Sequence, residues 1–152
     1  MRDLSLHILD VVENSLRASA HCVEIRIAEV EQEDLVSLEI ADDGEGMSEE
    51  MLQRAVDPFF TGRPDKRIGL GLALLAQAAR EADGGLDVSS TRGEGTRIRV
   101  TFRRSHPDRK PLGDIAATLE TLIAGNPDVD FVFEHRDGAD IVGIDTRGIR
   151  QP

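Results

Sequence analysis

Four short segments alternate apolar and polar side chains, and this alternation constrains the fold more than any other feature of the chain. Successive side chains of a strand point to opposite faces, so each segment predicts a β-strand with one buried face and one wet face. Strands of this kind need helices on one side only. The pattern predicts an α+β fold, a two-layer α/β sandwich with a mixed, mostly antiparallel sheet. The segments centre on residues 23–27, 36–40, 86–88 and 98–102.

Three helices are predicted to cover one face of this sheet. The first carries Leu9, Val12 and Leu16 at spacings of three and four, which predicts one buried stripe. Ser48 would cap the N-terminus of the second helix, and Gly84 with Gly85 would stop the third. The expected spans are residues 4–19, 48–56 and 71–82.

A further helix and hairpin are expected near the C-terminus. Ile115, Leu119 and Leu122 recur at helical spacing, and two strand-like runs flank Asp137 and Gly138. A stretch rich in turn-forming residues precedes them. We therefore expect a main domain over residues 1–104 and a C-terminal extension over 105–152, made of a linker, a helix and a β-hairpin.

The charge of the chain excludes some partners. Its 29 acidic and 18 basic residues give a net charge of -11, which argues against nonspecific binding to nucleic acid or to an anionic membrane. No apolar run is long enough to span a bilayer, and acidic residues interrupt the N-terminal segment, so we expect a cytoplasmic protein. The single cysteine, Cys22, excludes an intrachain disulfide.

The first predicted helix also has a polar face. Asp10, Asn14 and Arg17 lie at i, i+4 and i+7 and therefore align. They offer a carboxylate, an amide oxygen that can bind a hard cation, and a guanidinium that can bind phosphate. A merely solvated helix face is the alternative.

A glycine-rich turn follows the second predicted strand. In Asp42-Asp43-Gly44-Glu45-Gly46-Met47, a carboxylate could accept a hydrogen bond from a purine amino group, and the glycines would let the backbone approach the ring. The alternative is a plain turn that leaves the strand.

Residues 57–71 are expected to form an irregular, functional loop that leads into the third helix. Gly69 and Gly71 would expose backbone N–H groups to an anion at the helix N-terminus. The spacing is neither the dinucleotide-binding fingerprint nor a P-loop. Three cations in an otherwise acidic chain favour a triphosphate as the anion, with surface solubility as the alternative: Arg63, Lys66 and Arg67.

Taken in order, these segments resemble the sequence boxes of the GHKL superfamily, which has the Bergerat ATP-binding fold. LDVVENSLRASA is similar to the N box, ADDGEGM to the first glycine box and DPFFTGR to the phenylalanine box of histidine kinases. RIGLGLALL and GEGTRIRVTF resemble the second and third glycine boxes. The resemblance covers residues 4–103, and five boxes in the right order are a specific signal.

The resemblance implies a site for ATP and Mg²⁺. Asn14 would bind Mg²⁺, Asp42 would accept from the adenine amino group, and Thr96 would support the Asp42 end. Arg17 would contact phosphate, and residues 59–68 would form a lid. Gly44 and Gly46 would shape the base pocket, and Gly69 and Gly71 would meet the phosphates. The remaining residues that it assigns to ATP binding are Met47, Phe59, Phe60, Arg63, Lys66, Arg67, Leu70 and Leu72.

Two positions depart from the family pattern. Asp10 stands where hydrolysing members have a water-activating Glu, so the catalytic carboxylate is one methylene shorter. Arg67 replaces a usual Gly, which stiffens the lid and adds a charge.

Two functions compete on this basis. The first is a protein kinase, of the histidine-kinase-like or anti-sigma serine type, that passes the γ-phosphate to a partner protein. The second is a nucleotide-gated protein-binding module with little or no turnover. A slow ATPase clamp of the mismatch-repair type is a weaker reading, because such clamps carry a long domain after the ATPase. No phosphoacceptor helix precedes the first box, so the acceptor is expected on another chain, and a homodimer is compatible with this reading.

Overall fold

The chain forms one six-stranded sheet with its helices on a single face. The computed structural model describes residues 4–50, 66–106 and 113–148. The strand order is β3-β4-β2-β1-β5-β6, and every neighbouring pair is antiparallel except β1 and β5. The strands are β1 (Cys22–Val30), β2 (Leu35–Asp42), β3 (Gly85–Thr91), β4 (Gly95–Arg103), β5 (Asp130–Asp137) and β6 (Asp140–Asp145).

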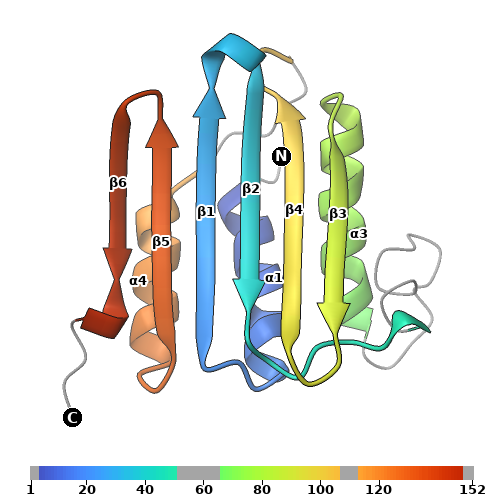
Figure 1. The fold of residues 1–152 in the computed structure, drawn as a ribbon, viewed down its shortest axis with the longest axis vertical. Helices are drawn as coiled ribbons and strands as arrows, with labels where there is room; N and C mark the ends of the chain where they lie inside the picture. The colour runs from blue at the N-terminus through green and yellow to red at the C-terminus, as the bar shows by residue number, and fades with distance from the viewer. Residues whose placement is uncertain (1–3, 51–65, 107–112, 149–152) are drawn as a thin grey trace.

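Three helices lie behind the sheet, all on the same side (Figure 1). This arrangement confirms the predicted two-layer sandwich and its mixed, mostly antiparallel sheet. Residues 49 and 50 begin the helix predicted from Ser48, and the rest of that segment lies outside the described residues. No helix within the described ranges is long and apolar enough to cross a membrane. The helices are α1 (Leu4–Arg17), α3 (Lys66–Glu81) and α4 (Ile115–Gly125), with short 3₁₀ turns η1 (Glu31–Glu33) and η2 (Thr146–Gly148).

The alternating side chains of the strands sort as the sequence predicts. In β1, β2 and β4 every second residue over most of the strand points into the helix layer and is buried. Its neighbours lie on the open face, where Arg97 of β4 pairs with Glu39 of β2 and Arg26 pairs with Glu24 along β1. Burial of the apolar set removes it from water and supplies the main stabilisation. These buried side chains include Val23, Ile25, Ile27, Val36, Leu38, Ile40, Ile98, Val100 and Phe102.

The buried stripe of α1 differs from the predicted one. Leu9 and Leu16 are only partly buried, whereas Leu4, Ile8 and Val11 are fully buried, together with the expected Val12. Two apolar series run along this helix at similar spacings, so spacing alone could not choose between them. The rotation of the helix is set by its contacts with the sheet, and it brings the polar Ser15 inside as well.

Helix α3 begins earlier than predicted. It starts at Lys66 rather than near Gly71, so Gly69 and Gly71 lie within the helix and do not precede its N-terminus. The prediction of an irregular segment through residue 71 was therefore wrong for residues 66–71. Each glycine costs a helix only about 1 kcal/mol, and the Lys, Arg, Ile and Leu residues around them favour the helix.

The C-terminal segment joins the same sheet. Strand β5 runs parallel to β1, with Val23 opposite Phe131, and β6 adds the outer edge of the sheet. The side chain of Phe131 is fully buried, and Leu119 and Leu122 of α4 belong to the same core. The helix and the hairpin lie where the sequence predicts them, and Gly138 takes the positive φ of 62° in the hairpin turn.

Candidate functional site

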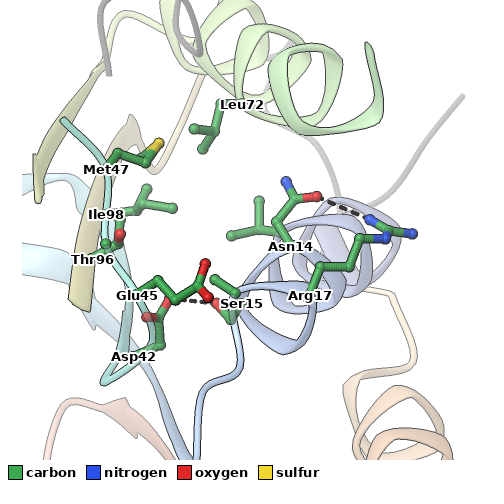
Figure 2. Close-up of a pocket in the computed structure, with 12 residues that line it drawn as sticks. Asn14, Ser15, Arg17, Asp42, Glu45, Met47, Leu72, Thr96 and Ile98 are labelled. Carbon is green, nitrogen blue, oxygen red and sulfur yellow. Dashed lines mark hydrogen bonds between the residues drawn. The ribbon is translucent and has the colours of Figure 1, made fainter. Parts of the chain in front are cut away.

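A pocket with a cavity volume of about 150 Å³ opens between α1, α3, β4 and the loop that follows β2. Figure 2 shows its labelled side chains: Asn14, Ser15 and Arg17 project from α1, Asp42 and Glu45 face them, and Leu72 approaches from α3. Segments distant in sequence therefore build one site. Its described lining residues are Val11, Asn14, Ser15, Arg17, Ala18, Asp42, Glu45, Gly46, Met47, Leu72, Thr96 and Ile98.

The carboxylate of Asp42, the last residue of β2, is held at both oxygens. Ser15 Oγ donates to Oδ2 at 2.6 Å, and the backbone N–H of Gly44 donates to Oδ1 at 2.9 Å. A carboxylate oxygen can accept more than one hydrogen bond. Asp42 is thus oriented on the pocket wall and can still accept from a ligand.

Gly44 and Gly46 let the loop after β2 pass close to its neighbours. A Cβ at Gly44 would lie 2.7 Å from the carbonyl oxygen of Ala18. Gly46 has φ +72°, and a Cβ there would collide with the carbonyl oxygen of Thr91. The backbone of Glu45 bonds on both sides, donating to Ala18 O at 2.8 Å and accepting from Gly93 N at 2.6 Å. The loop is therefore pinned between the end of α1 and the turn that joins β3 to β4.

Asn14 and Arg17 lie beside each other at the α1 side of the pocket. Arg17 Nη1 donates to Asn14 Oδ1 at 3.2 Å, as expected for residues three apart on a helix. In this conformation the Asn14 amide oxygen is directed at the Arg17 guanidinium and keeps a second lone pair, and both residues line the pocket (Figure 2). One protein oxygen, completed by phosphate and water oxygens, fits the coordination that Mg²⁺ prefers. The described residues hold no cluster of three or more His, Cys, Asp or Glu that could bind a metal by themselves.

Asp10 stands apart from the other predicted site residues. It lies one turn before Asn14 on α1 and is half-buried, but it is not among the described residues that line the pocket.

Thr96 stands directly opposite Asp42 in the register of β2 and β4, so the two share one face of the sheet. Its hydroxyl lies 2.8 Å from Ser90 Oγ on β3. Ser90 Oγ also accepts from the backbone N–H of Met47 at 2.7 Å. Ser90 therefore connects Thr96, on the wall of the pocket, to Met47 in the loop after β2, although Ser90 is not among the described residues that line the pocket.

The structure brings together seven of the predicted residues in this pocket: Asn14, Arg17, Asp42, Gly46, Met47, Leu72 and Thr96. Gly44 adjoins them through its bond to Asp42. Phe59, Phe60 and Arg63 lie outside the described residues, as does the predicted lid up to residue 65. Five further predicted residues are described as backbone of α3: Lys66, Arg67, Gly69, Leu70 and Gly71.

Ser15 and Ser90 support the pocket but were not among the predicted site residues. Each has a signal in the chain, because each is a polar residue where the periodicity calls for an apolar one. Ser15 follows Leu4, Ile8 and Val11 along the buried stripe of α1, and Ser90 follows Leu86 and Val88 on the inner face of β3. A polar side chain at such a place needs a partner inside the fold.

Similarity to known proteins agrees with this geometry. The Bacillus subtilis sensor histidine kinase YxdK is 32% identical over 104 residues, covering 65% of this chain and 32% of that protein. The Pseudomonas aeruginosa sensor protein kinase PilS is 33% identical over 103 residues, covering 64% of this chain and 19% of that protein. This chain thus spans about a third or less of the length of these relatives.

A solved structure has the same fold. The Aquifex aeolicus MutL ATPase domain, complexed with ADP, superposes with a TM-score of 0.54 at 17% identity, covering 91% of this chain and 60% of that chain. At this identity the likeness concerns the fold alone.

The family described as histidine kinase-, DNA gyrase B- and HSP90-like ATPases matches residues 2–106, more than half of the chain. The chain therefore belongs to this family, and the matched residues form its ATP-binding, histidine-kinase-like domain.

Proposed function

We propose that the pocket between α1, α3 and β4 binds Mg-ATP and that the chain passes the γ-phosphate to a side chain of a partner protein. The observation that carries the proposal is the juxtaposition of Asn14, Arg17 and Asp42 in one pocket. Asp42 would accept from the amino group of the base, and Arg17 would bind phosphate oxygens. The amide oxygen of Asn14 would hold Mg²⁺, which bridges phosphates and offsets their charge.

The transfer step would move one phosphoryl group. The bond between the γ-phosphorus and the oxygen that bridges it to the β-phosphate breaks, and a bond from the γ-phosphorus to the acceptor nitrogen or oxygen forms. The acceptor releases its proton to solvent, and ADP leaves with the electron pair of the broken bond. The chain's contribution is to position the phosphates and to offset their charge. We assign residues 1–104 to nucleotide binding and residues 105–152 to contact with the partner, in the cytoplasm.

ATP-dependent stabilisation tests the binding part. ATP at a hundred times its Kd would raise the free energy of unfolding by about 2.7 kcal/mol. Asn14→Ala and Asp42→Asn should lose most of this gain, and Asn14→Ala should lose the part that depends on Mg²⁺. Glu13→Ala and Asp87→Asn, at exposed positions outside the pocket, are the matched controls. Unchanged stabilisation in both pocket variants would refute the site.

Transfer is tested with γ-labelled ATP and the purified proteins encoded beside this chain. Label that is lost in acid but stable in base would indicate a phosphohistidine, and acid-stable label a phosphoserine. No transfer to any of these proteins would reject the kinase activity while leaving ATP binding intact.

One observation favours a second candidate, a nucleotide-gated protein-binding module. Asp10, the predicted catalytic carboxylate, is short and is not among the described lining residues. Binding without turnover would then switch affinity for a partner. The module requires that ATP and ADP give different affinities for that partner while phosphate release stays at background. Equal affinities would exclude it.

A further inference from the structure

A row of polar side chains crosses three strands on the inner face of the sheet. Asp42 on β2 is opposite Thr96 on β4, and Thr96 is in turn opposite Ser90 on β3. Directly opposed residues share a face and have Cβ atoms about 5 Å apart. Asp42 and Thr96 line the pocket, whereas Ser90 lies behind Thr96.

Ser90 Oγ has three polar contacts and a single proton. The N–H of Met47 donates to it at 2.7 Å, the carbonyl oxygen of Gly95 lies at 3.0 Å, and Thr96 Oγ1 lies at 2.8 Å. An amide N–H can only donate and a carbonyl oxygen can only accept. All three contacts are hydrogen bonds at once only if Ser90 donates to the carbonyl and accepts from the Thr96 hydroxyl. If Ser90 instead donates to the Thr96 hydroxyl, its single proton is no longer available to the Gly95 carbonyl oxygen.

This arrangement determines what Thr96 offers to the pocket. Because its proton is directed at Ser90, the Thr96 hydroxyl presents only lone pairs to a ligand. The neighbouring Asp42 carboxylate is also acceptor-only when ionised. Two adjacent acceptors attract an exocyclic amino group and disfavour a carbonyl oxygen at the same position, since a polar group buried without a partner is costly.

We propose that Ser90 is a positioning residue that holds the Thr96 hydroxyl as an acceptor and thereby makes the pocket select an amino-bearing base over an oxo-bearing one. The inference rests on the proposed binding of ATP in this pocket. Ser90 itself does not touch the nucleotide. It acts through Thr96 and through the Met47 amide, which keeps the loop after β2 against the same wall.

The test compares ATP with ITP, which carries a carbonyl oxygen where adenine has its amino group. Titration calorimetry on the full chain gives the ATP-to-ITP affinity ratio for the wild type, Ser90→Ala, Ser90→Thr and Ser89→Ala. Without Ser90 the Thr96 hydroxyl can turn and donate to the ITP carbonyl. We expect Ser90→Ala to lower the ratio about ten-fold, the effect of about one hydrogen bond. Ser90→Thr keeps the hydroxyl and should keep the ratio.

Ser89→Ala is the matched control, because Ser89 is the exposed neighbour of Ser90 on the opposite face of β3. A ratio unchanged in Ser90→Ala would overturn the inference, even if both affinities fell together, because a merely structural role weakens both. If Ser90→Ala does not fold, Thr96→Val is measured in its place. Because valine lacks the acceptor hydroxyl, the inference requires that Thr96→Val lower the ATP-to-ITP affinity ratio. No nucleotide binding by the wild type would reject the proposed site along with the inference, whereas wild-type binding with an unchanged variant ratio rejects the inference alone.

Discussion

Ser15 Oγ donates a 2.6 Å hydrogen bond to Oδ2 of Asp42, 27 residues further along the chain. The bond ties α1 to the end of β2, and Ser15 is only 4% exposed. It therefore fixes the carboxylate that we assign to the base of the nucleotide. The bond is partly buried, and a hydrogen bond to a charged group contributes more than one between neutral groups.

Ser15→Ala should consequently weaken ATP binding about ten-fold and lower the free energy of unfolding by roughly 1–3 kcal/mol. Titration calorimetry and urea unfolding measure the two effects. Ser37→Ala makes the same change on the open face of β2 and should alter neither. ATP affinity in Ser15→Ala equal to that of the wild type would show that Asp42 does not depend on this bond.

Gly46→Ala tests the close approach of the loop after β2 to β3. Gly46 combines φ +72° with a Cβ position that collides with the Thr91 carbonyl, whereas Gly138 combines φ +62° with open space. Gly138→Ala should therefore cost about 1–2 kcal/mol for the backbone conformation alone. Gly46→Ala should cost more and should also weaken ATP binding. If urea unfolding shows that Gly46→Ala and Gly138→Ala lower the free energy of unfolding equally, the loop can move away from the Thr91 carbonyl without strain.

Phe131→Ala tests whether the C-terminal segment stabilises the whole chain. Phe131 is fully buried on β5 opposite Val23 of β1, so its removal should cost about 3–5 kcal/mol. Ile141→Ala, on the outer strand β6 and 54% exposed, should cost far less. Urea unfolding followed by circular dichroism should show a single transition shifted in Phe131→Ala. A loss below about 1 kcal/mol would contradict the shared core.

Acid should weaken the junction between the turn after β1 and the end of β4. The hydrogen bond from the Ser105 hydroxyl, at 2.7 Å, chiefly lowers the pKa of Asp34, with further contributions from Arg103 and the Ser105 amide that outweigh desolvation. Because the folded pKa lies below the unfolded value of about 3.9, the stabilisation is complete above that value and is lost as pH falls through the folded pKa.

Asp34→Asn should therefore be less stable than the wild type at neutral pH, and the difference should shrink in acid. Asn tolerates the left-handed φ of 51° found at this position, so the backbone is retained. Urea midpoints measured across pH 2–7 provide the comparison, and Ser105→Ala should reduce the same pH dependence. A difference that is constant across this range would rule out titration of Asp34 as its source.

Much of this fold can be predicted from the amino-acid sequence, because strand alternation and helix spacing depend on residues that are close together in the chain. The alternation over 23–27, 36–40 and 98–102 identified the buried side chains, and the turn residues Asp137 and Gly138 located the hairpin. The boxes around Asn14, Asp42 and Thr96 identified most of the described pocket. The wrong prediction, an irregular loop at residues 66–71, also came from a local pattern, namely the glycines of this segment. The segment is helical in the structure, because the residues around the glycines favour a helix.

The two layers, the family and the main polar groups of the pocket can be predicted from the amino-acid sequence, since each follows from the order and spacing of nearby residues. Three other features became apparent only in the folded chain: which apolar series of α1 is buried, the parallel pairing of β5 with β1, and the hydrogen bonds of Ser15 to Asp42 and of Ser90 to Thr96. These relationships join residues far apart in the chain. Packing and hydrogen-bond satisfaction across the assembled sheet select them. The local pattern marks Ser15 and Ser90 as polar interruptions of apolar series, but it does not identify their partners.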